Sequence, residues 1–266
     1  MPLLAWILLC AALGGIASAA CAVAFLGVSE ARAARLLPHF VSFATGALLG
    51  AALLALLPEA IGAAGVQGAR GLGLALVLGL GFFFVTEKLI LWWHLAGHEE
   101  GVHQDPQAHG HAHAHRAHAS GILVLVGDSL HNALDGVLIA AAFLDHWSLG
   151  ILTTLAVAAH EIPHRVGDFA LLVHAGFSRE RALLLNLATG LASVLGALLA
   201  YAALRDSLAA LPYALAFAAA GFLYIAVAGL IPGLHRRVDP RASAAQVVLI
   251  SLGIAAIALA GRLTQL

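Results

Sequence analysis

Long apolar runs separated by short polar breaks constrain the fold of this chain more than any other feature. Each run has enough residues to cross the hydrocarbon core of a bilayer as a helix. Eight can be counted, at about 3–28, 38–62, 71–95, 121–144, 149–174, 180–204, 212–234 and 244–264. Because the backbone must satisfy its own hydrogen bonds in lipid, helices are favoured. We therefore expect an all-α polytopic membrane protein whose residues 1–266 form a single transmembrane domain.

The composition supports this class. Of the 266 residues, 62% are hydrophobic and only 10% are charged, and the mean hydropathy is +0.96. A soluble globular domain does not need so much apolar surface. The formal net charge of −1 gives no indication of a nucleic-acid partner, so the lipid bilayer is the expected surrounding.

The placement of arginine predicts the orientation. If the N-terminus lies outside, eight arginines fall in inner loops and three in outer loops or at the C-terminus. Cytoplasmic loops carry an excess of positive residues, so both termini are expected outside the cytoplasm. The expected location is the cell membrane, as a multi-pass protein of a bacterial inner or plasma membrane.

The loop between the third and fourth runs, residues 96–119, is rich in histidine. His109, His111, His113 and His115 alternate with small residues in a low-complexity stretch. Tracts of this composition bind metals weakly. A flexible linker with no specific role remains the alternative. The predicted orientation puts this loop in the cytoplasm.

Two polar motifs are embedded in the fourth and fifth apolar runs. They read His131-Asn132-Ala133-Leu134-Asp135 and His160-Glu161-Ile162-Pro163-His164. Ionisable groups are costly inside a membrane and indicate a functional site. Residues four apart in a helix share a face, so His131 points with Asp135, and His160 with His164. Three imidazoles and a carboxylate are a suitable ligand set for a divalent cation such as zinc.

Further polar residues adjoin this set. Asn132 and Glu161 each follow a ligand by one position, about 100° around the helix, and could form a second metal site beside the first. Asp128 precedes the first motif by three residues, and Asp168 follows the second by four. Each either orients a ligand imidazole or has a structural role. In the structural alternative Asp128 bonds neighbouring helices and Asp168 pairs with Arg165.

Proline and glycine near the motifs predict local geometry. Pro163 lacks an N–H and deprives a carbonyl of its helical partner, so we expect the backbone to open beside the ligands. Gly136 directly follows Asp135 and could let a neighbouring helix approach closely.

The second and seventh runs show a weak internal sequence similarity. They end with Leu57-Pro58-Glu59 and Ile231-Pro232-Gly233, each after a glycine- and alanine-rich stretch. Proline-interrupted helices at corresponding places suggest two repeats that flank a central pair of helices.

The motifs as a whole resemble those of the ZIP family of metal-ion transporters, in its branch with His-Glu-x-Pro-His. Residues 127–136 and 160–169 carry the resemblance most specifically, and it extends over nearly the whole chain. Supporting segments are residues 57–60 and 81–88, Asn186 and residues 221–226.

The resemblance implies a transporter and no enzyme, with about eight helices in a three-two-three arrangement of inverted repeats. It also implies import into the cytoplasm of zinc as substrate, with cadmium, iron, manganese, cobalt and nickel as open alternatives, and a possible homodimer. His131, Asp135, His160 and His164 then match the primary ligands. Asn132 and Glu161 match contributors to a neighbouring second site.

Two positions depart from the family pattern. The fifth-run motif usually continues His-Glu, but here His164 is followed by Arg165. Since Arg165 lies four residues after Glu161, we hypothesise that its guanidinium pairs with that carboxylate and replaces the second metal wholly or partly. Gly233 stands where the family often has glutamate, and His235 could substitute for it.

Two rival functions stay open at this point. His160-Glu161-x-x-His164 and Leu134-Asp135-Gly136 match the motifs of an intramembrane zinc metalloprotease. Against it, proline interrupts the first motif, the second motif precedes it, and four closed ligands leave no place for a catalytic water. The other rival is a metal sensor, which would bind metal without moving it.

Overall fold

The computed structural model describes residues 2–26, 30–99, 109–174, 176–236 and 239–264, and the regular structure in these ranges is helical. The elements are α1 (Leu3–Leu26), α2 (Glu30–Gly50), η1 (Ala51–Leu56), α3 (Leu57–Glu99), α4 (His109–Asp145), α5 (Trp147–His174), α6 (Arg179–Leu204), η2 (Leu208–Ala210), α7 (Leu211–Tyr224), η3 (Ile225–Leu230), α8 (Ile231–His235) and α9 (Pro240–Thr264). The predicted all-α class is confirmed.

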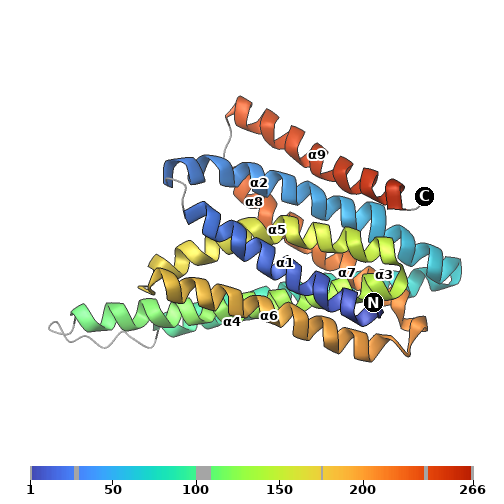
Figure 1. Cartoon of the computed structure of the whole chain (residues 1–266), viewed down its shortest axis with the longest axis horizontal. Helices are drawn as coiled ribbons and strands as arrows, with labels where there is room; N and C mark the ends of the chain where they lie inside the picture. The colour runs from blue at the N-terminus through green and yellow to red at the C-terminus, as the bar shows by residue number, and fades with distance from the viewer. Residues whose placement is uncertain (1, 27–29, 100–108, 175, 237–238, 265–266) are drawn as a thin grey trace.

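The long helices pack side by side in one bundle, in which two sets of neighbours can be distinguished by their contacts (Figure 1). In one group α4 lies against α5 and α6, and α1 lies against α5 and α6. In the other, α2 packs along α9 at the top of the view, and α3 packs along α7. Contacts of α2 with α5 and of α3 with α4 join the groups. The two motif-bearing helices, α4 and α5, are therefore direct neighbours.

Four helical stretches in the described ranges are long and apolar enough to cross a membrane. They are Arg35–Leu89, Arg179–Leu204, Leu208–His235 and Pro240–Leu263. The first is 55 residues long, but Gly65 breaks it with φ 63°, between the second and third predicted spans. The membrane-protein class is supported, while the count of eight spans stays a prediction.

The two proline-ended segments share an unusual local structure. η1 and η3 are π-helices of 6 residues, and each ends two residues before a proline, Pro58 and Pro232. In both, the N–H of the residue just before the proline bonds a carbonyl five residues back. A proline ring crowds the carbonyl four residues before it, and a wider π turn relieves that crowding. The sequence similarity between the second and seventh runs thus corresponds to the same local structure, a π-helix that ends two residues before a proline.

Glycines bring α4 and α6 into backbone contact. A Cβ at Gly136 would overlap the carbonyl of Ser193, and one at Gly196 would overlap the carbonyl of Ala133. Small residues allow this close packing between membrane helices. The predicted close approach at Gly136 is confirmed, and it places α6 directly beside the first polar motif.

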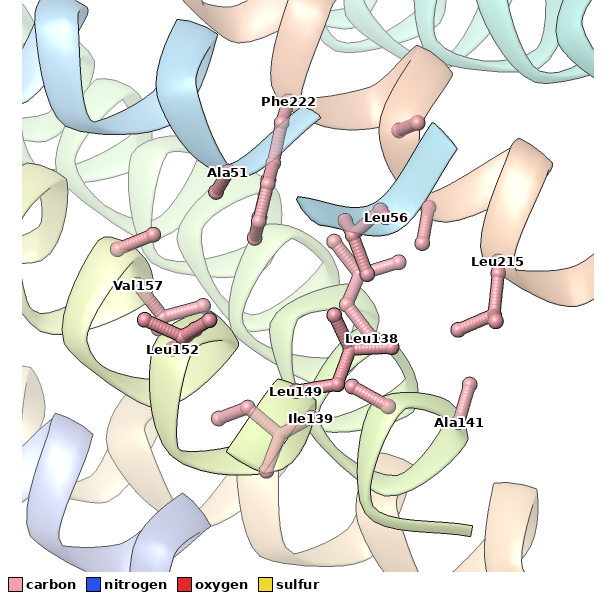
Figure 2. Close-up of a cluster of buried hydrophobic side chains, with 14 of the residues drawn as sticks. Ala51, Leu56, Leu138, Ile139, Ala141, Leu149, Leu152, Val157, Leu215 and Phe222 are labelled. Carbon is pink, nitrogen blue, oxygen red and sulfur yellow. The ribbon is translucent and has the colours of Figure 1, made fainter. Parts of the chain in front are cut away.

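An apolar plug lies between the polar motifs and one end of the bundle. Figure 2 shows its side chains, which include Ala51, Leu56, Leu138, Ile139, Ala141, Leu149, Leu152, Val157, Leu215 and Phe222. All ten are buried. Because α4 and α5 run antiparallel, the end of α4 and the start of α5 meet in this plug. The motifs lie on its other side, toward the start of α4 and the end of α5.

The histidine-rich stretch is described only at its flanks. α3 continues to Glu99 and α4 begins at His109, so residues 100–108 fall between the described helices. The side chains of His109, His111, His113 and His115 lie outside what the structure describes. The role of loop 96–119 and its cytoplasmic location stay predictions.

Candidate metal centre

α4 and α5 bring seven potential metal ligands together in two adjacent clusters. The inner cluster consists of His131, Asp135, His160 and Glu161. The cavity cluster consists of Asp128, His164 and Asp168. Within each cluster, one donor atom from every residue lies within 4.8 Å of the others.

The spacing of the inner cluster suits one tetrahedral ion. His131 Nε2 lies 3.1 Å from His160 Nε2, and both nitrogens face Asp135 Oδ2, at 3.7 and 3.4 Å respectively. Glu161 Oε1 lies 3.7 Å from His131 Nε2. Four ligands around zinc at bond lengths of about 2.0–2.1 Å are separated by roughly 3.3–3.4 Å. The donor atoms are therefore placed to share one ion.

Two carboxylate oxygens of the inner cluster are buried without a hydrogen-bond partner. Among the described residues, Asp135 Oδ2 and Glu161 Oε1 have none. Buried polar atoms are nearly always paired, and an exception indicates a site for water or an ion. His160 Nδ1 faces the carbonyl of Ala156 at 3.2 Å, which directs Nε2 toward these oxygens. The cluster thus has the chemistry of a cation site.

The structure groups the predicted primary ligands differently from the prediction. His131, Asp135 and His160 meet as expected, but Glu161, assigned to the second site, joins them. His164 lies in the cavity cluster, half-exposed, although its ring centroid is 5.1 Å from that of His131. α5 also remains helical through Pro163, which differs from the expected opening of the backbone.

Arg165 is fully buried where α4, α5 and α6 meet. Its Nε donates to Glu161 Oε2 at 2.8 Å, so the predicted ion pair is present. The guanidinium also donates to Asp128, Asn132, Asn186 and Thr189. Asn132, predicted for the second metal site, thereby has its carbonyl oxygen 2.5 Å from Arg165 Nη2.

The hydrogen-bond partners of Arg165 on α6 were not predicted as part of the site. Asn186 accepts from Arg165 and returns a bond to the Arg165 carbonyl at 3.1 Å, and Thr189 accepts at 2.5 Å. Both are buried. The sequence did contain an indication of their role. Asn186 and Thr189 are polar residues three positions apart in a largely apolar run, and this spacing puts them on one face of the helix.

The two flanking aspartates have different surroundings. Asp128 is buried, accepts from Asn132 at 2.9 Å, and lies 3.3 Å from Arg165 Nη1. Its other neighbour is His164, so it contacts both a helix partner and a possible ligand. Asp168 lies 3.5 Å from His164 Nε2. The described side chains show no Arg165–Asp168 ion pair, which had been the structural alternative for Asp168.

A cavity of about 620 Å³ adjoins both clusters on the side away from the apolar plug. Its walls include Asp128, His131, His164 and Asp168. Tyr224 also lines it and donates a hydrogen bond to Glu87, which links α7 to α3. The inner cluster consequently lies between an apolar barrier and a mainly apolar cavity into whose lining several polar side chains are set.

Comparison with known proteins agrees with the motifs. A family model described as ZIP Zinc transporter matches residues 94–261. Zinc transporter ZIP13 of Homo sapiens is 36% identical over 265 residues, covering 85% of this chain and 71% of that protein. The Pongo abelii ZIP13 is 38% identical and the match covers 82% of this chain, which spans 65% of that longer protein. Human zinc transporter ZIP4 is 43% identical over 45% of this chain. The chain belongs to the ZIP family of zinc transporters.

Proposed function

We propose that this chain carries zinc across the membrane through the inner cluster, His131, Asp135, His160 and Glu161. The observation that carries this proposal is the pair of unpartnered buried carboxylate oxygens, held at zinc-like spacing from two imidazole nitrogens. Transport needs a site that opens to one side at a time. The apolar plug and the cavity on opposite sides of the cluster support such an arrangement.

We propose that zinc is transported into the cytoplasm. The cavity lies toward the start of α4, which the arginine distribution places on the cytoplasmic side. In that orientation the structure corresponds to the stage at which zinc leaves the protein. We further propose a cell-membrane location with both termini outside, and a homodimer as the assembly. Labelling of single cysteines introduced at either end, in intact cells, tests the orientation.

We also propose that the inner cluster holds one zinc ion and that Arg165 takes the place of a second cation. Its guanidinium bonds Glu161 Oε2 and Asn132 Oδ1, the groups expected to form the second site. Arginine remains charged in proteins, so a divalent ion beside it would be repelled. Titration calorimetry on purified protein should give one tight zinc per chain. Two tight ions per chain would refute this stoichiometry.

The donor set favours zinc among the possible metals. Two imidazole nitrogens and two carboxylate oxygens are borderline ligands that suit zinc in tetrahedral geometry. Cadmium, iron, manganese, cobalt and nickel are the competitors to include in an uptake assay.

The rival functions have less support. A protease needs an open metal position for water, whereas the inner cluster offers four protein donors. The named relatives are zinc transporters, which does not favour a protease. A sensor would bind zinc without flux.

Uptake of radioactive zinc into proteoliposomes separates these functions. Wild-type protein should show saturable uptake, and His160→Ala should abolish it because one of the two imidazole donors is lost. His39→Ala, which removes an exposed histidine on α2, is the matched control and should transport normally. Zinc binding without uptake by folded wild type would contradict the transporter and favour a sensor.

A further inference from the structure

We propose that the hydroxyl of Thr153 on α5 contacts zinc on its way in, between the outer side of the membrane and the inner cluster. This inference rests on the proposed transport through the inner cluster and adds a step that precedes binding there. Thr153 belongs to neither polar motif and to neither cluster of candidate ligands. It lies in the part of α5 that contributes Leu149, Leu152 and Val157 to the apolar plug (Figure 2).

The side chain of Thr153 is buried with its hydrogen-bonding capacity unused. It is 1% exposed, and its Oγ1 has no hydrogen-bond partner among the described residues. The next residue, Thr154, donates to the carbonyl of Gly150 at 2.7 Å. Ser42 and Thr45 likewise donate to carbonyls four residues back, which is the usual arrangement for a hydroxyl inside an apolar helix. A buried polar atom without a partner is destabilising, so it indicates a water or ligand that binds in another state of the protein.

Thr153 lies on the same face of α5 as the two histidines of the second motif. α5 remains helical from Trp147 to His174. Thr153 precedes His160 by seven residues and His164 by eleven. At about 100° per residue, these spacings put all three side chains within roughly 20° of one line along the helix. Thr153 is about 10 Å from His160 along the axis, on the side away from the cytoplasm in the proposed orientation.

The apolar plug is the barrier that an ion from outside has to cross. A second cavity, of about 470 Å³, lies at the end of the plug that the proposed orientation places outside, and Asp145 and Leu211 are part of its lining. Ala141 and Leu215, one helical turn deeper, already belong to the plug. A zinc ion that lost its water in a wholly apolar passage would face a large desolvation penalty. The Thr153 oxygen lowers this penalty, because it bonds a hydration water or the ion itself within the plug.

Thr153→Val tests the proposal, because valine keeps the shape of the side chain and removes the hydroxyl. Zinc uptake into proteoliposomes should fall about tenfold, the factor expected when one polar contact to a charged species is lost. The Tm should stay the same or rise, since an unpartnered buried hydroxyl is removed. Thr153→Ser should keep the uptake, and Thr154→Val is the matched control. Uptake by Thr153→Val equal to that of the control would overturn the proposal. A lower Tm than the control would also overturn it, because the hydroxyl would then make a structural hydrogen bond.

A thiol at the same position tests access from outside without relying on transport. Thr153→Cys should react with a membrane-impermeant methanethiosulfonate reagent added outside, and the reaction should block zinc uptake. Thr154→Cys should react much less, and the native cysteines are the same in both variants. Adding His160→Ala should abolish uptake but leave the thiol reaction. Equal reaction of Thr153→Cys and Thr154→Cys would overturn the entry contact and leave the transporter intact. Absence of zinc uptake by the wild type would instead overturn the proposed transport itself.

Discussion

Replacing Arg165 with methionine should destabilise the protein strongly. The substitution keeps much of the apolar volume but removes the charge that compensates Glu161 and Asp128, which lie 2.8 and 3.3 Å from the guanidinium. All three side chains are at most 2% exposed. The oxygens of Asn132, Asn186 and Thr189 also lose a buried donor.

The size of the expected loss of stability follows from the burial of these three side chains. Removing one partner of a buried ion pair costs about 3–5 kcal/mol because the remaining charge is uncompensated. For a chain of this size 1 kcal/mol corresponds to about 2–4 °C, so the Tm should fall by about 6–20 °C. Zinc should restore part of the loss, since a second ion can occupy the place of the guanidinium and bind only the folded state.

Thermal unfolding of purified protein, first in chelator and then at increasing zinc, measures both effects. Arg205→Met is the matched control because Arg205 pairs with Asp206 at the exposed surface, where an ion pair contributes about 0–1 kcal/mol. A Tm of Arg165→Met within the range of the Arg205→Met control would refute the view that Arg165 is a structural cation. If Arg165→Met lowers the Tm strongly but binds the same number of zinc ions as the wild type, Arg165 is a structural cation. That result would refute the proposal that its guanidinium takes the place of a second metal ion.

Three further predictions concern packing and pH. Gly136→Ala should destabilise the protein by about 1–3 kcal/mol through overpacking against α6, whereas Gly167→Ala, with open space around its Cβ, should be nearly neutral in the same thermal assay. Phe222→Ala should lower the free energy of unfolding by about 3–5 kcal/mol, because Phe222 is fully buried in the plug, and an unchanged Tm would show that the plug is loosely packed. Zinc uptake should decline below pH of about 6.5, since imidazole ligands must be deprotonated to bind metal, and an uptake rate that rises steadily with acidity would indicate proton coupling instead.

Much of the fold class and most of the inner cluster could be predicted from the sequence. Apolar runs and helical periodicity are local properties, and they placed His131, Asp135 and His160 together. The spacing of four residues likewise predicted the pair of Arg165 and Glu161, which the structure contains.

The remaining features depend on how the helices pack, which spacing does not reveal. Helical periodicity gives the direction of a side chain around the axis, but not its distance from the neighbouring helix. His164 shares a face with His160 yet lies one turn nearer the cavity, where Asp128 and Asp168 are its neighbours. Asn186 and Thr189 joined the site because glycines bring α6 against α4, and nothing in the second motif pointed to α6. Pro163 did not interrupt α5, since loss of one hydrogen bond is insufficient to break a helix packed on several sides.

The location of bound zinc tests the central claim most directly. Anomalous scattering from crystals of the zinc-bound protein, recorded at the zinc edge, would show each ion without reference to activity. We expect one strong peak enclosed by His131, Asp135, His160 and Glu161, with at most a weaker one at the cavity cluster. A strong peak at the position of the Arg165 guanidinium, or none within the inner cluster, would contradict it.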